Sequence, residues 1–519
     1  MNDTDDTNNT NDTSNGGRHD TPPLPTVVVG GGSAGAVLAA RLSEDPDRQV
    51  LLLEAGPAYE PDAYPAEVAS SSVLGGYTGH DWGYLSEPGH IGHPVAAYRG
   101  KVLGGSSAVN GSVAVRALPS DFARWSERGL KGWSYEDLLS AFKVLESTEA
   151  GDDDVHGRSG PLPVVQLTRG DISPMEGAFV DAALADGIRP VDDFNGADPE
   201  GVGPYPMNVR DGVRVNTGMA YLTGAVRARP NLTIRADVLV DRVSFENGRA
   251  VGVVLADGME VRAGEVILSA GTYGSAAILL RSGIGPAEDL EALDIPVVAD
   301  LPVGLRLQDH PFYYNAYAAV PDRVGEQTPV IGAKVWTASS EAAEGELDLH
   351  ITATHLFDHA TSPTGVGFVL AVALVHPESQ GTLTLVSRDP RDPPRIDLNF
   401  LAEPGDRRRL IEGVKLARRL GATEPLAALI ERELNPGPQA RSDAEIEASM
   451  LATLDTYHHP TSTAPMGADD DPTAVTDRLG AVRGVPGLRV VDASIFPDVP
   501  SAATNLTVIA AAEHIARQI

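Results

Sequence analysis

The first strongly patterned part of the chain alternates strand-like and helix-like hydrophobic runs. Residues 26–30 (TVVVG) and 48–56 (RQVLLLEAG) are β-branched or leucine-rich, as buried strands usually are. Between them, residues 31–44 (GGSAGAVLAARLSE) begin with glycines and then place apolar side chains at helical spacing. The pattern therefore predicts a strand, a glycine turn, a helix and a second strand, which together form a βαβ unit.

Two later regions, residues 161–214 and 311–480, carry a different pattern. Their apolar runs predict several strands of an antiparallel sheet, and these runs are KVWTA, LDLHITATHL, VGFVLAVALVH, GTLTLVS and RIDLNF. Residues 403–421 have apolar side chains at helical spacing and predict a long helix. The two regions together predict a second domain of the α+β class.

The stretch between these regions, residues 231–271, is again rich in β-forming residues. It contains two turn signals, Asn247-Gly248 and Asp257-Gly258, which favour tight hairpins. We therefore expect a meander of strands that leads back to the first domain.

Composition narrows the class of protein. The 519 residues include 40 Lys and Arg against 72 Asp and Glu, a net charge of −32, so we expect no nucleic-acid partner. The absence of cysteine excludes disulfides and thiolate chemistry. Residues 1–23 open with an Asn-, Asp- and Thr-rich stretch, where we expect a disordered tail rather than a secretory signal. The longest apolar runs are shorter than the ~20 residues of a membrane-spanning helix, so we expect a soluble, cytoplasmic protein without a membrane span.

A glycine motif at the first predicted turn indicates a nucleotide-binding site. Gly30, Gly32 and Gly35 form GxGxxG between the predicted strand and helix, and Glu54 lies at the end of the next strand. A helix N-terminus offers free N–H groups to a pyrophosphate, and a carboxylate at that place accepts hydrogen bonds from a ribose. The motif favours an ADP-containing dinucleotide, NAD or FAD, over a turn that merely packs the helix on the strand.

The residues around Ser33 also spell GxSxG, the nucleophile elbow of α/β-hydrolases. An elbow needs a sheet beneath it and an oxyanion donor from an earlier loop, and too little chain precedes Ser33 to supply either. A hydrolase with Ser33 as nucleophile is therefore a remote alternative.

Five blocks in a fixed order resemble one known family. They are TVVVGGGSAGAVLAARL, RGKVLGGSSAVNGSVAVRALPSDFARW, GTYGSAAILLRSGIG, TYHHPTSTAPMG and VVDASIFPDVPSAATNLTVIAAAEHIA. Together they are similar to the glucose-methanol-choline (GMC) flavoprotein oxidoreductases. The resemblance implies an α/β Rossmann-type FAD-binding domain plus an α+β substrate domain with a mainly antiparallel sheet. It assigns residues 24–160, 215–310 and 481–519 to the FAD-binding domain, and residues 161–214 and 311–480 to the substrate domain.

The resemblance also implies which residues hold the cofactor. The ADP portion would lie against Gly30, Gly32, Ser33, Gly35, Glu54 and Ala55, with Val238 near the adenine. The isoalloxazine would lie along Val102, Gly105 and Asn110, and the ribityl chain near Asp492 and Ala493. Further contacts are expected from Ala34, Gly111, Ala270, Asn505 and Leu506. Some members link the flavin covalently to a histidine, and because Val109 stands at that position we expect FAD to be non-covalent.

His459 matches the catalytic histidine of the family, because Pro460, Thr463, Met466 and Gly467 follow it at the family's spacing. A histidine can take the hydroxyl proton near neutral pH while hydride leaves the alcohol carbon for flavin N5. His458 occupies a neighbouring position that is more often aromatic. Asn505 is the second expected catalytic residue, whereas Ala503 stands where many members carry a catalytic His or Asn.

The expected activity is FAD-dependent oxidation of a small-molecule alcohol to a carbonyl, with O₂ or a quinone or redox protein as the electron acceptor. A lyase of the hydroxynitrile type and a photodecarboxylase are alternatives on the same fold. The spacing of His350, His355 and His359 with Asp358 does not match a metal-binding helix, so we expect no metal there and a cavity-lining role instead. The particular alcohol and the oligomeric state stay open.

Overall fold

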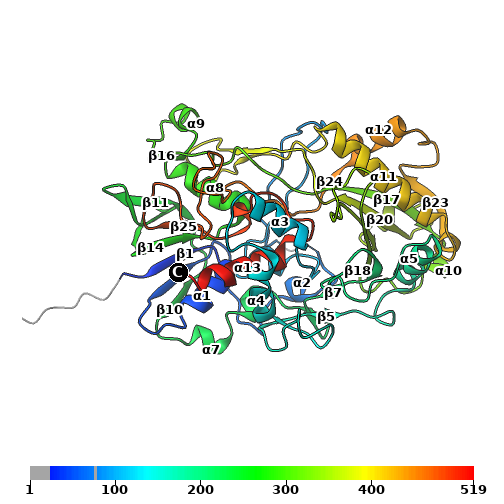
Figure 1. Cartoon of the computed structure of the whole chain (residues 1–519), viewed down its shortest axis with the longest axis horizontal. Coiled ribbons are helices and arrows are strands. Elements are labelled where there is room, and N and C mark those ends of the chain that lie inside the picture. The colour runs from blue at the N-terminus through cyan, green and yellow to red at the C-terminus, as the bar shows by residue number, and fades with distance from the viewer. Residues whose placement is uncertain (1–23, 75–78) are drawn as a thin grey trace, which may run out of the picture.

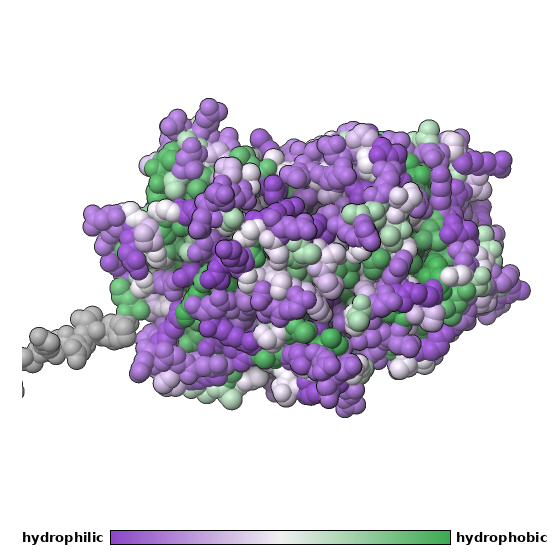
Figure 2. Space-filling view, viewed as in Figure 1, coloured by the Kyte–Doolittle hydropathy of each residue, from purple (hydrophilic) through white to green (hydrophobic). Residues whose placement is uncertain are grey.

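The computed structural model describes residues 24–74 and 79–519, and the tail predicted at residues 1–23 lies outside the described residues. The described chain contains two main sheets, one at the left and one at the right of Figure 1. Most side chains on the face in Figure 2 are hydrophilic.

The sheet at the left is parallel and has five strands. Their spatial order is β10 (Leu232–Arg235), β2 (Val50–Leu53), β1 (Thr26–Val29), β14 (Glu265–Leu268) and β25 (Leu488–Val490). In the register of the sheet, Thr26 pairs with Val50 on one side and with Glu265 on the other. All four residues of β1 are buried, because parallel sheets are covered on both faces. The βαβ unit predicted from the sequence is therefore present.

Helices position the ends of these strands. Helix α1 (Gly35–Leu42) connects β1 to β2 and packs against α13 (Thr504–Ala516), which also contacts α4 (Tyr135–Leu145). These three helices lie together beside the parallel sheet in Figure 1. Helix α8 (Gly271–Arg281) follows β14 directly. The N-termini of α1, α8 and α13 thus begin close to the carboxyl ends of the parallel strands.

The predicted meander is also present. Strands β11 (Val240–Glu246), β12 (Arg249–Leu255) and β13 (Glu260–Arg262) form an antiparallel sheet that leads into β14. Both residues of the first turn have positive φ, 52° at Asn247 and 76° at Gly248, as a two-residue hairpin turn requires.

The sheet at the right is antiparallel and has seven strands. The path through it is β23 (Ile430–Asn435), β17 (Pro311–Ala319), β20 (Gly367–Leu374), β19 (Leu349–Thr354), β18 (Ile331–Thr337) and β6 (Gly201–Pro204), and β24 (Asp455–Thr456) also pairs with β17. Helix α11 (Pro404–Gly421), predicted over residues 403–421, packs on β19 and β20, and α5 (Pro174–Ala185) packs on β18 and β19. One cluster of buried apolar side chains includes Val28 of β1 and Val372 of β20, so the two sheets share a continuous core.

Two runs predicted as strands of this sheet belong elsewhere. Strands β21 (Thr382–Thr384) and β22 (Arg395–Asp397) pair only with each other, in a separate two-stranded sheet. The Pro- and Asp-rich segment between them turns the chain back, so each strand finds its partner locally. The prediction that they join the antiparallel sheet was wrong, because an apolar run does not specify which strand it pairs with.

The strands of the parallel sheet all fall within residues 24–160, 215–310 and 481–519, and those of the seven-stranded sheet within residues 161–214 and 311–480. The division into two domains at these bounds stays a prediction. Among the described residues, no helix has both the length and the apolar character needed to cross a membrane.

The remaining elements are short and mostly lie in the connections. The helices are α2 (Ala66–Ala69), α3 (Pro119–Glu127), α6 (Thr217–Ala220), α7 (Gly224–Arg227), α9 (Ala287–Ala292), α10 (Pro321–Val324) and α12 (Asp443–Thr453). The 3₁₀ turns are η1 (Gly105–Ala108), η2 (His359–Thr361), η3 (Leu426–Leu429) and η4 (Ala493–Ile495). The strands are β3 (Glu146–Ser147), β4 (Leu162–Pro163), β5 (Val165–Gln166), β7 (Pro206–Met207), β8 (Val209–Arg210), β9 (Val213–Arg214), β15 (Ile284–Gly285) and β16 (Ala299–Asp300).

Candidate active site

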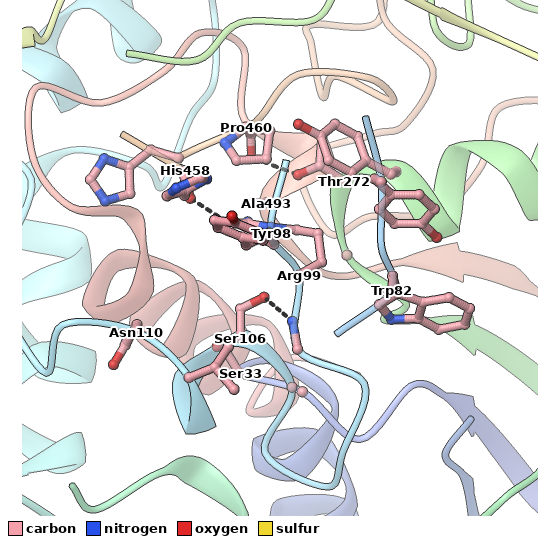
Figure 3. A pocket seen from close by; sticks show the side chains of 18 of the residues that line it. Ser33, Trp82, Tyr98, Arg99, Ser106, Asn110, Thr272, His458, Pro460 and Ala493 are labelled. Atoms are coloured by element: carbon pink, nitrogen blue, oxygen red, sulfur yellow. Dashed lines mark hydrogen bonds between the residues drawn. The ribbon is translucent and has the colours of Figure 1, made fainter. Parts of the chain in front are cut away.

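A cavity of about 970 Å³ reaches from the carboxyl ends of the parallel strands to the seven-stranded sheet. Figure 3 shows Ser33, Ser106 and Asn110 at one end of it and His458 and Pro460 at the other. A volume of this size accommodates a large cofactor with a small substrate beside it.

The glycine-rich end presents bare backbone from two loops. Gly30 has φ +95°, and a Cβ on it would lie 2.5 Å from the carbonyl oxygen of Ser269. A Cβ on Gly105 would lie 2.7 Å from Cα of Gly32, so the η1 turn and the first glycine turn approach each other without side chains between them. Backbone N–H groups left open at a helix N-terminus in this way suit a pyrophosphate. The residues present therefore fit a dinucleotide such as FAD.

Glu54 lies beside this cradle, at the end of β2. Its Oε2 accepts a hydrogen bond from the backbone N–H of Gly31 at 2.7 Å, and its Oε1 accepts one from Gly56 at 2.8 Å. Burial raises the pKa of the Glu54 carboxyl to about 7. The two backbone bonds fix the carboxyl group in the wall of the cavity, where it can accept hydrogen bonds from a ribose.

A second carboxylate organises the opposite side of the cradle. Oδ2 of Asp492 accepts hydrogen bonds from the N–H of Gly271 at 2.9 Å and from the hydroxyl of Ser275 at 2.6 Å. Its Oδ1 accepts hydrogen bonds from the backbone and hydroxyl of Ser494. Burial raises the pKa of Asp492. This residue ties the end of β25 to the beginning of α8 at the cavity wall.

The N-terminus of α13 also reaches the glycine turn. The hydroxyl of Ser33 donates a hydrogen bond to Oδ1 of Asn505 at 2.7 Å. Ala503 is the N-cap residue of α13 and lines the cavity together with Thr504 and Asn505. Asn505 is thus placed beside the cofactor cradle, and its role in catalysis stays a prediction.

Most of the residues predicted to hold the cofactor line the cavity. These are Gly30, Gly32, Ser33, Ala34, Glu54, Ala55, Gly105, Asn110, Gly111, Val238, Ala270, Asp492, Ala493 and Asn505. Three others support the wall from behind. A Cβ on Gly35 would lie 1.8 Å from the carbonyl oxygen of Gly30, Val102 packs in a small apolar cluster, and Leu506 belongs to the main core.

At the histidine end, His459 lines the cavity just after β24. Its backbone N–H donates to Oδ1 of Asp309 at 2.7 Å, and its Nδ1 lies 3.0 Å from Nδ1 of His310. Burial, followed by the nearby His310 and Arg99, holds the pKa of His459 well below its usual range. The ring is therefore neutral near pH 7 and able to accept a proton from a bound molecule.

His458 has different surroundings. Its φ is +64°, a left-handed conformation that costs a non-glycine residue of order 1–3 kcal/mol and requires support from its neighbours. Its N–H donates to the hydroxyl of Thr456 at 2.8 Å, and its carbonyl accepts from the Arg99 guanidinium at 2.6 Å. The ring packs on Tyr98, with 5.3 Å between centroids, and burial lowers the pKa of His458 to about 3.

Asp309 holds this loop in place. Its Oδ1 accepts the backbone N–H of both His310 and His459 at 2.7 Å, and its Oδ2 accepts the hydroxyl of Thr456 at 2.7 Å. Burial raises the pKa of Asp309 to about 6. Because one carboxyl group connects residues 309–310 with residues 456–459, the two histidine rings are brought together by the backbone.

Several lining residues were not identified from the sequence. Phe312 and Tyr457 stack at 4.1 Å with an interplanar angle of 6°, and Tyr314 contacts Phe312 at 5.1 Å, which forms an aromatic wall beside His459. His310, which lies behind the cavity wall with its Nδ1 against Nδ1 of His459, was not predicted either. No local signal could reveal these residues, because they meet through strand pairing between distant segments.

The three histidines considered for a metal are separated. His355 and Asp358 line the cavity, whereas His350 is buried behind it against Trp336, with 4.7 Å between the ring centroids. His359 contacts the ring of Phe357. Within residues 24–74 and 79–519, no group of three or more His, Cys, Asp or Glu side chains is arranged to hold a metal ion.

Comparison with known proteins agrees with this architecture. The family described as GMC oxidoreductase matches residues 24–312 with its N-terminal part and residues 377–512 with its C-terminal part. An oxygen-dependent choline dehydrogenase of Paraburkholderia phymatum is 38% identical, over 95% of this chain and 92% of its own. The mitochondrial choline dehydrogenase of Mus musculus is also 38% identical, over 94% of this chain and 88% of its own.

A solved structure supports the same family assignment. The crystal structure of pyridoxine 4-oxidase from Mesorbium loti superimposes with a TM-score of 0.87 at 34% identity, over 95% of this chain and 99% of its own. The cradle of bare backbone, the buried carboxylates and the histidine loop occupy one cavity in this fold. The chain therefore belongs to the GMC oxidoreductases, a family of FAD-binding flavoproteins.

Proposed function

We propose that the protein oxidises a small-molecule alcohol to a carbonyl compound with non-covalently bound FAD, and that His459 is the general base. The observation that carries the proposal is the position of a neutral histidine in the same cavity as the dinucleotide cradle. FAD, when bound, supplies the hydride acceptor. The other requirements of the reaction fall to residues of the chain.

The first requirement is a base for the hydroxyl proton. An alcohol carbon releases hydride readily only as its oxygen loses a proton, and a neutral imidazole can accept that proton. His459 is held by Asp309 and His310, so its ring is positioned before a substrate arrives. Such positioning lowers the entropic cost of reaching the reactive geometry.

The second requirement is stabilisation of negative charge at the cofactor. Helix α13 has 13 residues, and its first turn lines the cavity with Thr504 and Asn505. The N-terminal end of a helix carries a partial positive charge that favours a nearby anion. The guanidinium of Arg99, bound to the carbonyl of His458, adds a positive charge at the cavity wall.

The names of the relatives support an alcohol substrate, since those proteins act on choline and on pyridoxine. The aromatic wall of Phe312, Tyr314 and Tyr457 next to His459 would surround the carbon skeleton of such a substrate. For the electron acceptor, the proposal includes O₂ and a quinone or redox protein.

An anaerobic titration tests the proposal. Purified yellow protein is mixed with choline, pyridoxine and benzyl alcohol in turn, and flavin absorbance near its visible maximum is followed. We expect at least one alcohol to bleach the flavin, and His459→Ala to bleach much more slowly with the same FAD content. Release of a carbonyl and cyanide from a cyanohydrin without bleaching would instead indicate a lyase. Light-dependent loss of CO₂ from a fatty acid would indicate a photodecarboxylase.

A further inference from the structure

The contact between His310 and His459 joins identical atoms. Their two Nδ1 atoms are 3.0 Å apart, within hydrogen-bond distance. Burial lowers the pKa of His310 to about 3 and that of His459 well below its usual range, so both rings are neutral near pH 7. A neutral imidazole carries one proton, on one nitrogen, and its other nitrogen accepts. One ring therefore donates through Nδ1 and the other accepts.

The two possible arrangements have opposite consequences for His459. If His310 donated the proton, His459 would carry its own proton on Nε2, the nitrogen left for the cavity. Nε2 could then donate a hydrogen bond but could not accept the proton of an alcohol. If His459 donates, its Nε2 keeps a lone pair that faces the cavity.

The proposed role of His459 selects one of the two arrangements. A general base for an alcohol needs an unprotonated nitrogen toward the cavity, so Nε2 of His459 must be bare and its Nδ1 must carry the proton. The contact of 3.0 Å between the two Nδ1 atoms then makes Nδ1 of His310 the acceptor and puts the proton of His310 on Nε2. That nitrogen is buried and has no hydrogen-bond partner among the described residues.

We propose that His310 is a positioning residue that accepts the Nδ1–H of His459 and so keeps Nε2 of His459 unprotonated toward the substrate. This inference rests on the proposed function of His459 as the base. During alcohol oxidation, Nε2 of His459 would take the hydroxyl proton, and bound FAD would supply the acceptor for the hydride. The imidazolium that results has protons on both nitrogens, and its hydrogen bond to His310 gains a charged donor, which strengthens it.

Asp309 holds the backbone of His310 and His459 in the positions that bring their rings into contact. It accepts the backbone N–H of both histidines, so the distance between the rings is set by the backbone and not only by the side chains. A partner that fixes the tautomer and orientation of a functional histidine is a recurrent arrangement, and its loss costs roughly 10- to 100-fold in activity at metal sites. We expect an effect of that size here.

The test compares His310→Asn with His310→Leu. The amide oxygen of Asn can occupy the place of Nδ1 and accept a hydrogen bond, whereas Leu fills similar space without an acceptor. Holoenzyme containing ¹⁵N-labelled histidine is studied by NMR at neutral pH without alcohol, because protonated and bare ring nitrogens have well-separated ¹⁵N shifts. The signals of His459 are identified by their loss in His459→Gln.

In the unmodified protein and in His310→Asn we expect His459 to carry its proton on Nδ1. In His310→Leu we expect a substantial part of the protons to move to Nε2, and flavin reduction to slow roughly 10- to 100-fold with little change in KM. A purely structural role would affect both variants alike. A proton on Nε2 of His459 in the unmodified protein, or equal tautomers and rates in the two variants, would overturn the inference.

Failure of the inference about His310 can be distinguished from failure of the proposed alcohol oxidation. If no alcohol reduces the flavin, the proposed activity is wrong, while the NMR spectrum still reports the tautomer. If His310→Leu does not fold or bind FAD, the spectra of the unmodified protein and of His310→Asn decide the result on their own.

Discussion

At the scale of single residues, His458 and His459 are adjacent but differ in their surroundings. His459 has its N–H on Asp309 and its Nδ1 on His310, whereas His458 uses its carbonyl to bind Arg99. We predict that His459→Ala slows flavin reduction by about 10²- to 10⁴-fold, the range of general acid–base catalysis, with FAD still bound. His458→Ala should slow it much less. Stopped-flow reduction by the best alcohol measures both, and the reverse order would show that the wrong histidine has been assigned as the base.

Ala503 presents a methyl group in the cavity wall, at the position where the family resemblance leads us to expect a second polar residue. A hydrogen bond to a charged or developing-charge group is worth roughly 1.5 to 3 kcal/mol, which corresponds to about one to two decades in rate. We predict that Ala503→Asn accelerates flavin reduction by a simple alcohol by that order.

The control for this prediction is Ala503→Val, which adds volume without a hydrogen-bonding group. Because Ala503 is also the N-cap residue of α13, Asn there should stabilise the helix by about 1 kcal/mol, which thermal unfolding detects separately. An unchanged rate at unchanged FAD content would mean that another group already holds the substrate hydroxyl.

Residue spacing predicted one end of the cavity better than the other. GxGxxG and Glu54 lie within one βαβ unit, so their spacing along the chain reflects their positions in space. The contact between His310 and His459 joins residues 149 positions apart. The pairing of β17 with β24 and the carboxyl group of Asp309 bring these segments together, and contacts of that kind leave no local trace in the sequence.

At the scale of elements, the periodic runs were predicted reliably and their partners were not. Helix α11 follows the predicted residues closely, and β19 and β20 lie within their predicted runs, whereas β18 begins at Ile331, three residues before the predicted run KVWTA. Strands β21 and β22 were also predicted as strands, but they form their own small sheet. Alternation of apolar residues reports which face is buried, and it contains no information about the neighbouring strand.

The connection that follows α4 contains a second buried histidine, His156, whose contribution to stability depends on pH. Nδ1 of His156 lies 2.9 Å from Glu146, which begins β3, and Nε2 lies 2.9 Å from Asp193. Burial lowers the pKa of His156, but the hydrogen bonds to Asp193 and Glu146 outweigh it and raise the pKa to about 9. The protonated ring therefore joins two carboxylates in the folded protein.

This arrangement predicts a stability change on the alkaline side. The folded pKa lies above the unfolded value of about 6.5, so the stabilisation is complete below that pH and is lost as the pH rises through about 9. Urea unfolding between pH 7 and 10 should show a steeper loss of stability in the unmodified protein than in His156→Gln. His376→Gln, at a half-buried histidine beside Glu346, is the matched control. Equal slopes in all three proteins would contradict the prediction.

At the scale of the whole molecule, the cavity predicts how the cofactor is retained. Val109 lines the cavity and has no group that could bond to a flavin. We predict that the protein purifies yellow and that acid precipitation releases all of the colour into the supernatant, where FAD is identified by chromatography. Colour that stays in the protein pellet would show a covalent link through some other residue.

The order of strands in the parallel sheet also governs when the protein can acquire its cofactor. β1 pairs with β14, and β14 pairs with β25, which the ribosome makes about 460 residues after β1. At a synthesis rate of roughly 5–20 residues per second, tens of seconds pass between the synthesis of β1 and that of β25, which completes the sheet. The nascent chain thus carries an intact GxGxxG motif long before Asp492 and Asn505 exist to close the cradle. Loading of FAD is consequently a late event in biogenesis, and until then exposed strands of the incomplete sheet are the segments in most need of chaperones.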